Sequence, residues 1–571
     1  MTALMVRRAL AQYARRPLNL VLLVIVPVAL VFVWGGSLAA FSKLLGGTTS
    51  HGQLEAATAG WAAAALAGLA GFFQVSGSRS ADGRLAAAGG RTGAVVAGRL
   101  GASLVLALLA AAGGLIALAA RAGITDPLRA VAVTVLSAVI YLALGVLVGT
   151  LVRSDMNGAL VVTLAWVFDV FFGPAMGTSH LVVTWLFPLH FPTLVLIGQA
   201  SGHAGPIGDV GWALLWAVGL SALAVARLVA TTRPAPAAAG ASQRMVVAPA
   251  TVAASGRALP APTRPPTSDA AAAAARPVPA PVLVRARAPR QAATWARLGA
   301  VLRADMREYR RNRVLWALLV VVPAIFIVMA VAVTPDKLGP VVLVDGGRRF
   351  TAMLSMRRVH AATMAPVTAA FLAGITGLFV ITGSAGGDRR LVLAGFRPRE
   401  VLAGRLGVIA GASVVTTAVA VAVSGALFPP RQWVVFTAAN LLIALTYALA
   451  GVLIGPLTGR LGGLYLILLL AFVDVGLGQT VMFTSVPPAW GAFLPARGAS
   501  RMLIDGAFTG RVDTLRFLLL SLLWLGVLAA ATIVVFQRRT GLKHRKSAAP
   551  RTGEKSDPRA ATGSVPVLRP S

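Results

Sequence analysis

The sequence predicts an all-α polytopic membrane protein with about 12 transmembrane helices, arranged as two parallel six-helix halves. The 571-residue chain is 57% hydrophobic and 12% charged, with a mean hydropathy of +0.80, which differs strongly from soluble globular domains. Apolar runs of the length that a bilayer requires recur along it. The second half also repeats the first at a nearly constant offset.

About 20 apolar residues are needed for one helix to cross a bilayer, and this length selects six runs in each half. In the first half they are residues 18–40, 57–76, 95–120, 129–151, 157–174 and 210–230. In the second half they are residues 314–333, 362–383, 401–427, 432–457, 462–483 and 515–536. The first run follows a basic start, as in a secretory signal. A similar segment begins at Met306, so we expect residues 18–40 to be a retained span.

These runs divide the chain into four parts. Residues 1–231 and 296–540 are the two six-span halves, 232–295 form a disordered cytoplasmic linker rich in Pro and Ala, and 541–571 form a basic disordered cytoplasmic tail. A cytoplasmic N-terminus places 39 of the 52 Lys and Arg residues inside and 13 outside. We therefore expect a bacterial plasma membrane protein with both termini in the cytoplasm. The outer loop 334–361 departs from the rule because it carries five basic residues.

Several kinds of chemistry are excluded. The chain has no cysteine and only six histidines, none in an HExxH pattern, so we predict no catalytic residues and no metal site. The formal charge of +34 comes from basic residues that flank apolar runs or lie in the linker and tail, which favours membrane topology over nucleic-acid binding. None of the five lysines follows a glycine, as a phosphate-binding G-x-x-x-x-G-K loop requires. The chain is therefore not expected to be an enzyme that hydrolyses ATP.

A charged stretch between the second and third predicted spans occurs twice. Residues 82–101 and 388–407 are identical at 12 of 20 positions at an offset of 306, and residues 141–151 and 447–457 match at the same offset. An even number of spans in each half gives both copies the same orientation in the membrane.

These motifs resemble ABC-2 type permeases, the membrane subunits of ATP-driven exporters. The resemblance covers the charged loop, a basic amphipathic helix before the first span, and a proline-bearing segment between spans five and six, with Pro188 and Pro495. The loop residues are Asp82, Arg84, Leu85, Arg91, Gly98, Arg99 and Leu100, with Asp388, Arg390, Leu391, Arg397, Glu400, Gly404, Arg405 and Leu406. The helix residues are Arg7, Arg8, Tyr13, Arg15 and Arg16, with Arg303, Arg307, Tyr309, Arg310 and Arg311. The chain departs from the family's common form by joining two permeases that usually pair as separate copies.

The resemblance implies an exporter of an amphipathic or hydrophobic small molecule, such as a drug, an antibiotic or a lipid-like compound. Two copies of a separate ABC ATPase would bind ATP and Mg and dock on Asp82, Arg84, Arg91, Asp388, Arg390, Arg397 and Glu400. The chain itself would bind no cofactor directly, and its other partners would be membrane lipids, not nucleic acid. Alternatively, the loop arginines only anchor span ends against lipid headgroups. The amphipathic segments 5–16 and 299–311 either lie on the membrane surface or take part in coupling.

Asp169 and Asp474 occupy matching places in the fifth predicted spans. An ionisable group inside a span is costly and indicates a functional site. The two carboxylates either attract a cationic substrate or accept hydrogen bonds between helices, and Tyr141 and Tyr447 are further candidates for the pathway or for the packed core. Proline and glycine interrupt the apolar segments that follow, which predicts a re-entrant hairpin near the outer surface.

Two other classes of function remain open. Six plus six spans also fit a proton-driven secondary transporter with Asp169 and Asp474 as relays. The stretch "GGDRRLVLAGF" from Gly386 begins like the charged loop of the major facilitator carriers, but continues with apolar residues where glycine and arginines are expected. The second alternative is a non-transporting membrane scaffold or sensor.

Overall fold

A computed structural model describes most of both halves. The described residues are 2–15, 17–47, 49–178, 182–233, 299–300, 302–303, 306–307, 309–310, 312–482, 486–511 and 515–540. The predicted tail 541–571, and the predicted linker 232–295 apart from its first two residues, lie outside this part of the chain. Arg16 and Arg311 also lie outside it.

The described part is predominantly helical, as expected. The first half contains α1 (Thr2–Ala14), α2 (Pro17–Leu45), α3 (His51–Ser76), α4 (Arg79–Ala87), α5 (Thr92–Arg121), α6 (Pro127–Leu151), α7 (Asp155–Phe171), α8 (His190–Ile197) and α9 (Gly208–Thr232). The second half contains α13 (Arg313–Val333), β1 (Leu338–Asp345), β2 (Arg348–Ser355), α14 (Met356–Leu393), α15 (Pro398–Leu427), α16 (Trp433–Ala471), the π-helix η4 (Phe472–Gly478), α17 (Arg497–Phe508) and α18 (Leu515–Thr540).

Ten helices among the described residues are long and apolar enough to cross a membrane. The sequence prediction of about 12 differs at two places. The run 157–174 forms α7, which has only 17 residues. The runs 432–457 and 462–483 lie within α16 and η4 on either side of a kink at Gly459, where φ is +79° and ψ is −172°, and they are counted together as one 46-residue stretch from Trp433 to Gly478. That backbone conformation is open essentially to glycine alone.

Local sequence explains where several helices begin. Ser50 and Gln53 cap α3 reciprocally: the Gln53 amide donates to the Ser50 hydroxyl at 3.4 Å, and the Ser50 amide donates to the Gln53 side chain at 2.9 Å. Asp126 caps α6 by accepting from the Arg129 amide at 3.1 Å, and Pro127 occupies the first turn of that helix, where no N–H is needed.

The prediction for residues 334–361 was incomplete, because they contain an antiparallel hairpin rather than loop alone. β1 and β2 pair from Leu338 with Ser355 to Asp345 with Arg348. Gly346 and Gly347 join them with φ values of +63° and +75°, as a two-residue hairpin turn of the primed type requires. The fold is therefore all-α except for this one hairpin in the described residues.

Matching glycines pack the centre of each half. A side chain on Gly145 of α6 would collide with the Gly68 carbonyl of α3, and one on Gly451 of α16 would collide with the Gly374 carbonyl of α14. Both pairs are related by the offset of 306. Inside a membrane the hydrophobic effect contributes little to association between helices, so close van der Waals packing becomes important. Small residues allow that close approach. The repeat therefore preserves the same central helix contact in both halves.

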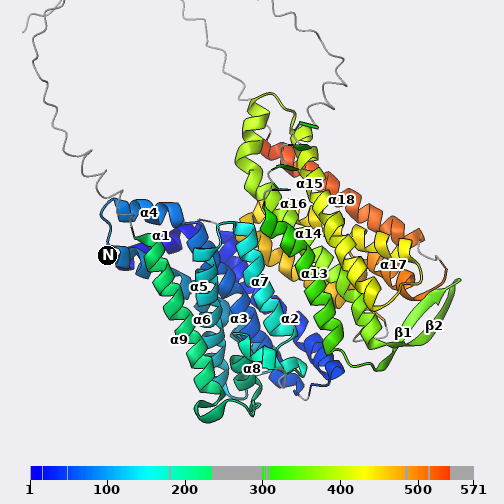
Figure 1. Ribbon diagram of the computed structural model, residues 1–571, viewed down its shortest axis with the longest axis horizontal. Coiled ribbons are helices and arrows are strands. Elements are labelled where there is room, and N and C mark those ends of the chain that lie inside the picture. Colours follow the sequence, from blue (N-terminus) through cyan, green and yellow to red (C-terminus); the bar gives the residue numbers. More distant parts are fainter. Residues whose placement is uncertain are drawn as a thin grey trace, which may run out of the picture.

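The halves lie side by side in Figure 1, with the first in blue to green and the second in green to red. Aromatic side chains join them: the Trp34 and Phe472 rings lie 5.3 Å apart between centroids, and Phe171 lies 5.6 Å from Phe472 and 6.2 Å from Phe326. The Tyr465 hydroxyl donates to the Leu66 carbonyl across the same boundary at 3.0 Å. On the outside, α18 exposes Leu519, Leu522 and Leu523, as a lipid-facing helix would.

Candidate functional site

The two copies of the charged loop fold into the same buried ion pair. In the first copy, Nη2 of Arg99 donates to Oδ1 of Asp82 at 2.9 Å, and the Ser78 hydroxyl donates to Oδ2 at 2.7 Å. In the second, Nη2 of Arg405 donates to Oδ1 of Asp388 at 2.8 Å, and the Ser384 hydroxyl donates to Oδ2 at 2.8 Å. We call each trio a clasp, because it ties α4 or the end of α14 to the following span.

The repeated Gly-Arg-Leu-Gly motif combines this pairing with close helix packing. Gly98 and Gly101 face Met5 and Val6 of α1, and a side chain at Gly98 would overlap Met5. In the second copy, Gly407 faces Leu302. Arg99 and Arg405 are mostly buried, with 12% and 7% of their side chains exposed, so their contacts are internal rather than with lipid headgroups.

The predicted docking residues separate into buried acids and exposed bases. Asp82, Asp388 and Glu400 are buried, and Oε2 of Glu400 accepts from the Arg397 amide at 3.1 Å. The exposed charged residues on the loops are all arginines: Arg84, Arg91, Arg389, Arg390, Arg397 and Arg399. Of the predicted interfacial arginines, the described ones are also exposed: Arg7, Arg8, Arg15, Arg303, Arg307 and Arg310. The acids therefore shape the loops, while the outer surface is cationic.

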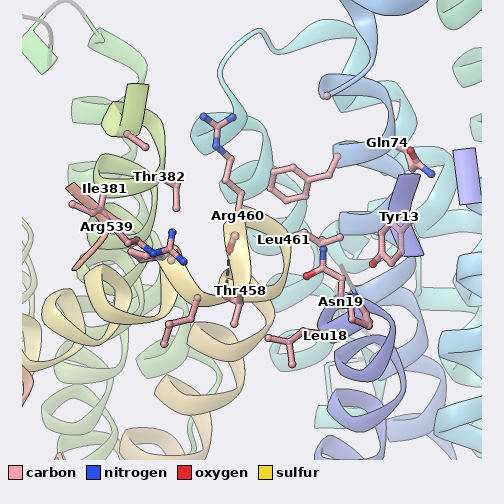
Figure 2. A pocket seen from close by; sticks show the side chains of 18 of the residues that line it. Tyr13, Leu18, Asn19, Gln74, Ile381, Thr382, Thr458, Arg460, Leu461 and Arg539 are labelled. Carbon is pink, nitrogen blue, oxygen red and sulfur yellow. Dashed lines mark hydrogen bonds between the residues drawn. The ribbon is translucent and has the colours of Figure 1, made fainter. Parts of the chain in front are cut away.

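Both clasps border one cavity between the halves. Figure 2 shows this cavity from close by. It has a volume of about 1180 Å³, and its lining includes Arg99 and Asp388. We call this side of the molecule the clasp end. Across the boundary, Arg460 pairs with Asp155, and Asn157 donates to Asn312 at 3.1 Å. None of these four residues was predicted as a site residue, because their contacts depend on how the halves pack together.

The structure brings the predicted pathway residues together in two matching groups. The Tyr141 hydroxyl donates to Asp169, whose other carboxylate oxygen accepts from the Leu189 amide at 3.2 Å. The Tyr447 hydroxyl donates to Asp474 at 2.9 Å, and this carboxylate also accepts from the Ala496 amide at 2.8 Å and from Gln479 at 2.9 Å. All four predicted residues are buried, and none of them lines the cavity.

These carboxylates hold the segments for which a re-entrant hairpin was predicted. Leu189 and Ala496 immediately precede the short helices α8 and α17. Each aspartate therefore accepts from a free N–H at a helix start, where negative charge is favourable. These contacts match the second of the two roles considered for Asp169 and Asp474, in which the carboxylates accept hydrogen bonds between helices.

A pair of histidines lies beside α8. Nε2 of His190 is 3.3 Å from Nε2 of His203, and the His203 ring stacks on Trp185 with centroids 3.9 Å apart. Burial, with a smaller contribution from His203, lowers the pKa of His190 to about 4, against an opposing effect of Asp209. No group of three or more potential ligand residues that could hold a metal ion occurs in the described residues.

Comparison with known proteins gives no family assignment: no family model matches the chain, and no curated protein matches it.

Proposed function

We propose that this chain is the membrane permease of an ATP-driven exporter and that two copies of a separate ABC ATPase drive it. The two matching clasps beside a cavity between the halves carry the proposal. A rigid buried ion pair lets a force on the loop reach the following span, because the loop and the helix move together. Two equivalent loops suit two equivalent motor subunits.

The proposed arrangement has two parallel six-helix halves in a bacterial plasma membrane, with the clasp end and both termini in the cytoplasm. ATP and Mg belong to the partner, which hydrolyses ATP. The predicted docking arginines Arg84, Arg91, Arg390 and Arg397 are exposed and would meet carboxylates on the ATPase, since complementary charge governs the rate and specificity of such contacts. The cargo is an amphipathic or hydrophobic small molecule that enters through the cavity.

Charge reversal at the loops tests the docking step. Arg84→Glu combined with Arg390→Glu is expected to abolish copurification of an ABC ATPase with the tagged chain from native membranes, together with substrate-stimulated ATP hydrolysis. The matched control, Arg348→Glu with Arg358→Glu, changes the same number of exposed arginines on and beside the hairpin and should leave both readouts unchanged. Equal ATPase recovery with the loop variant and the parent chain would contradict the proposal.

A transport measurement separates the proposal from a proton-driven carrier. In sealed vesicles, export should require ATP and the ATPase subunit and should persist when the proton gradient is dissipated. Export that continues without the ATPase while the proton gradient is intact would instead establish the proton-driven alternative.

A further inference from the structure

The cavity between the halves is lined by more basic than acidic residues, unlike the buried sites around Asp169 and Asp474. Its volume of about 1180 Å³ exceeds the range of about 300–1,000 Å³ that is typical of small-molecule sites. Helices of both halves form its walls, and Figure 2 shows Tyr13, Asn19 and Gln74 on one side and Arg539, Ile381 and Thr382 on the other. A ligand held here would contact both halves at once.

The charged residues of the lining are four arginines and one aspartate. Three of these five charges are already matched: Arg99 pairs with Asp82, Asp388 pairs with Arg405, and Arg460 pairs with Asp155. The side chains of Arg389 and Arg539 form no hydrogen bond or ion pair within the described residues, and both are exposed. The cavity therefore has two unmatched positive charges.

The remaining lining is largely apolar. Leu18, Phe73, Ile381, Leu461 and Phe536 supply apolar wall. An apolar ligand body placed against this wall would remove apolar surface from water, which favours binding.

We propose that the cavity binds an anionic amphiphile, with a carboxylate or phosphate head group between Arg389 and Arg539 and an apolar body against the wall. This inference rests on the proposed function, because it names the chemical class of the exported molecule. The proposed ligand is therefore negatively charged, whereas attraction by Asp169 and Asp474 would require a cationic ligand. Those two carboxylates are buried, do not line the cavity and already accept hydrogen bonds. Arginine suits such a head group because its planar donors bind carboxylate or phosphate with two hydrogen bonds.

Equilibrium binding without the ATPase tests the charge selectivity. The full chain is placed in nanodiscs of neutral phosphatidylcholine and titrated with a pyrene-labelled long-chain carboxylate, the matched alcohol and the matched amine. The carboxylate is expected to bind at least about tenfold more tightly than the alcohol, because hydrogen bonds to an ionised group are roughly twice as strong as those between neutral groups. Equal or tighter binding of the alcohol or the amine would overturn the inference.

Exposed arginines outside the cavity provide a matched control. Arg389→Gln with Arg539→Gln should weaken carboxylate binding about tenfold or more, whereas Arg358→Gln with Arg538→Gln removes two exposed arginines that do not line the cavity. The control should bind like the parent chain, and Arg389→Lys with Arg539→Lys should retain most of the binding. Equal weakening in the cavity pair and the control pair would contradict the assignment, provided that both keep the parent melting temperature.

The head group could belong to a free amphiphile or to a membrane phospholipid. Adding phosphatidylglycerol to the discs distinguishes them: competition that depends on Arg389 and Arg539 assigns the cavity to a bilayer lipid, and unchanged probe binding assigns it to a separate amphiphile. Both outcomes support an anionic ligand. Selective binding without ATP-driven export would reject the proposed function alone, and ATP-driven export of an uncharged or cationic compound without carboxylate binding would reject this inference alone.

Discussion

Nη2 of Arg405 lies 2.8 Å from Oδ1 of Asp388, and only 7% and 2% of the two side chains are exposed. Removing one member leaves the other charged and buried, which costs about 3–5 kcal/mol. Asp388→Ala should therefore lower the free energy of unfolding by about that amount, as measured by denaturant unfolding in detergent. Arg399→Ala, at an exposed position on α15, should change it by less than about 0.5 kcal/mol. Similar losses in the two variants would show that the ion pair does not stabilise the loop.

The two buried Tyr–Asp pairs should differ in their sensitivity to loss of the hydroxyl. Tyr141→Phe leaves Asp169 with the Leu189 amide as its described donor, whereas Tyr447→Phe leaves Asp474 bonded to Gln479 and the Ala496 amide. A charged hydrogen bond contributes about 1.5–3 kcal/mol, and the less supported carboxylate should lose more when it is removed. Melting temperatures should therefore fall further for Tyr141→Phe than for Tyr447→Phe; the opposite order would contradict this.

Gly459 should tolerate no other residue without strain, because φ is +79° and ψ is −172° at the kink in α16. Gly459→Ala is expected to destabilise the chain by about 1–3 kcal/mol and to change the cavity that Gly459 lines. Gly411→Ala in α15, where a side chain would meet open space, is the control. Thermal unfolding of both variants checks the difference, and equal stability would show that the kink can adapt.

Stability should fall on mild acidification because of His190. Its folded-state pKa of about 4 lies below the usual histidine value of 6.5, so the unfolded chain binds more protons between these values. The stabilisation from a neutral His190 is complete above about pH 6.5 and is lost progressively as the pH falls toward 4. Melting temperatures at pH 7 and pH 5 should differ more for the parent chain than for His190→Gln. An identical pH dependence would exclude His190 as its source.

Hydropathy predicted most spans because each needs only a local run of apolar residues, and the repeat correctly placed equivalent residues such as Tyr141 and Tyr447 in equivalent contacts. The hairpin was missed because its strands have eight residues each, too short for a search based on membrane thickness, although Asp345, Gly346 and Gly347 carry a recognisable turn signal. The kink at Gly459 falls between the predicted runs 432–457 and 462–483.

The sequence predicted the repeated charges of the clasps but not how they pair. The charges were recognised as repeated, but Asp82 and Arg99 are separated by 17 residues, and no helical period brings such positions together. Ser78 and Ser384 were missed although they share the repeat offset of 306. The cavity could not be predicted at all, because it depends on the packing of segments hundreds of residues apart.

The hairpin gives the molecule an asymmetry with a consequence for stoichiometry. The first half joins α2 to α3 through residues 46–50, whereas the second inserts β1 and β2 at the corresponding place. A protein that binds the loop arginines would find two equivalent binding sites on one chain, so its complex should contain two copies of that protein. A protein that binds the hairpin would find one binding site, so its complex should contain one copy in a single orientation.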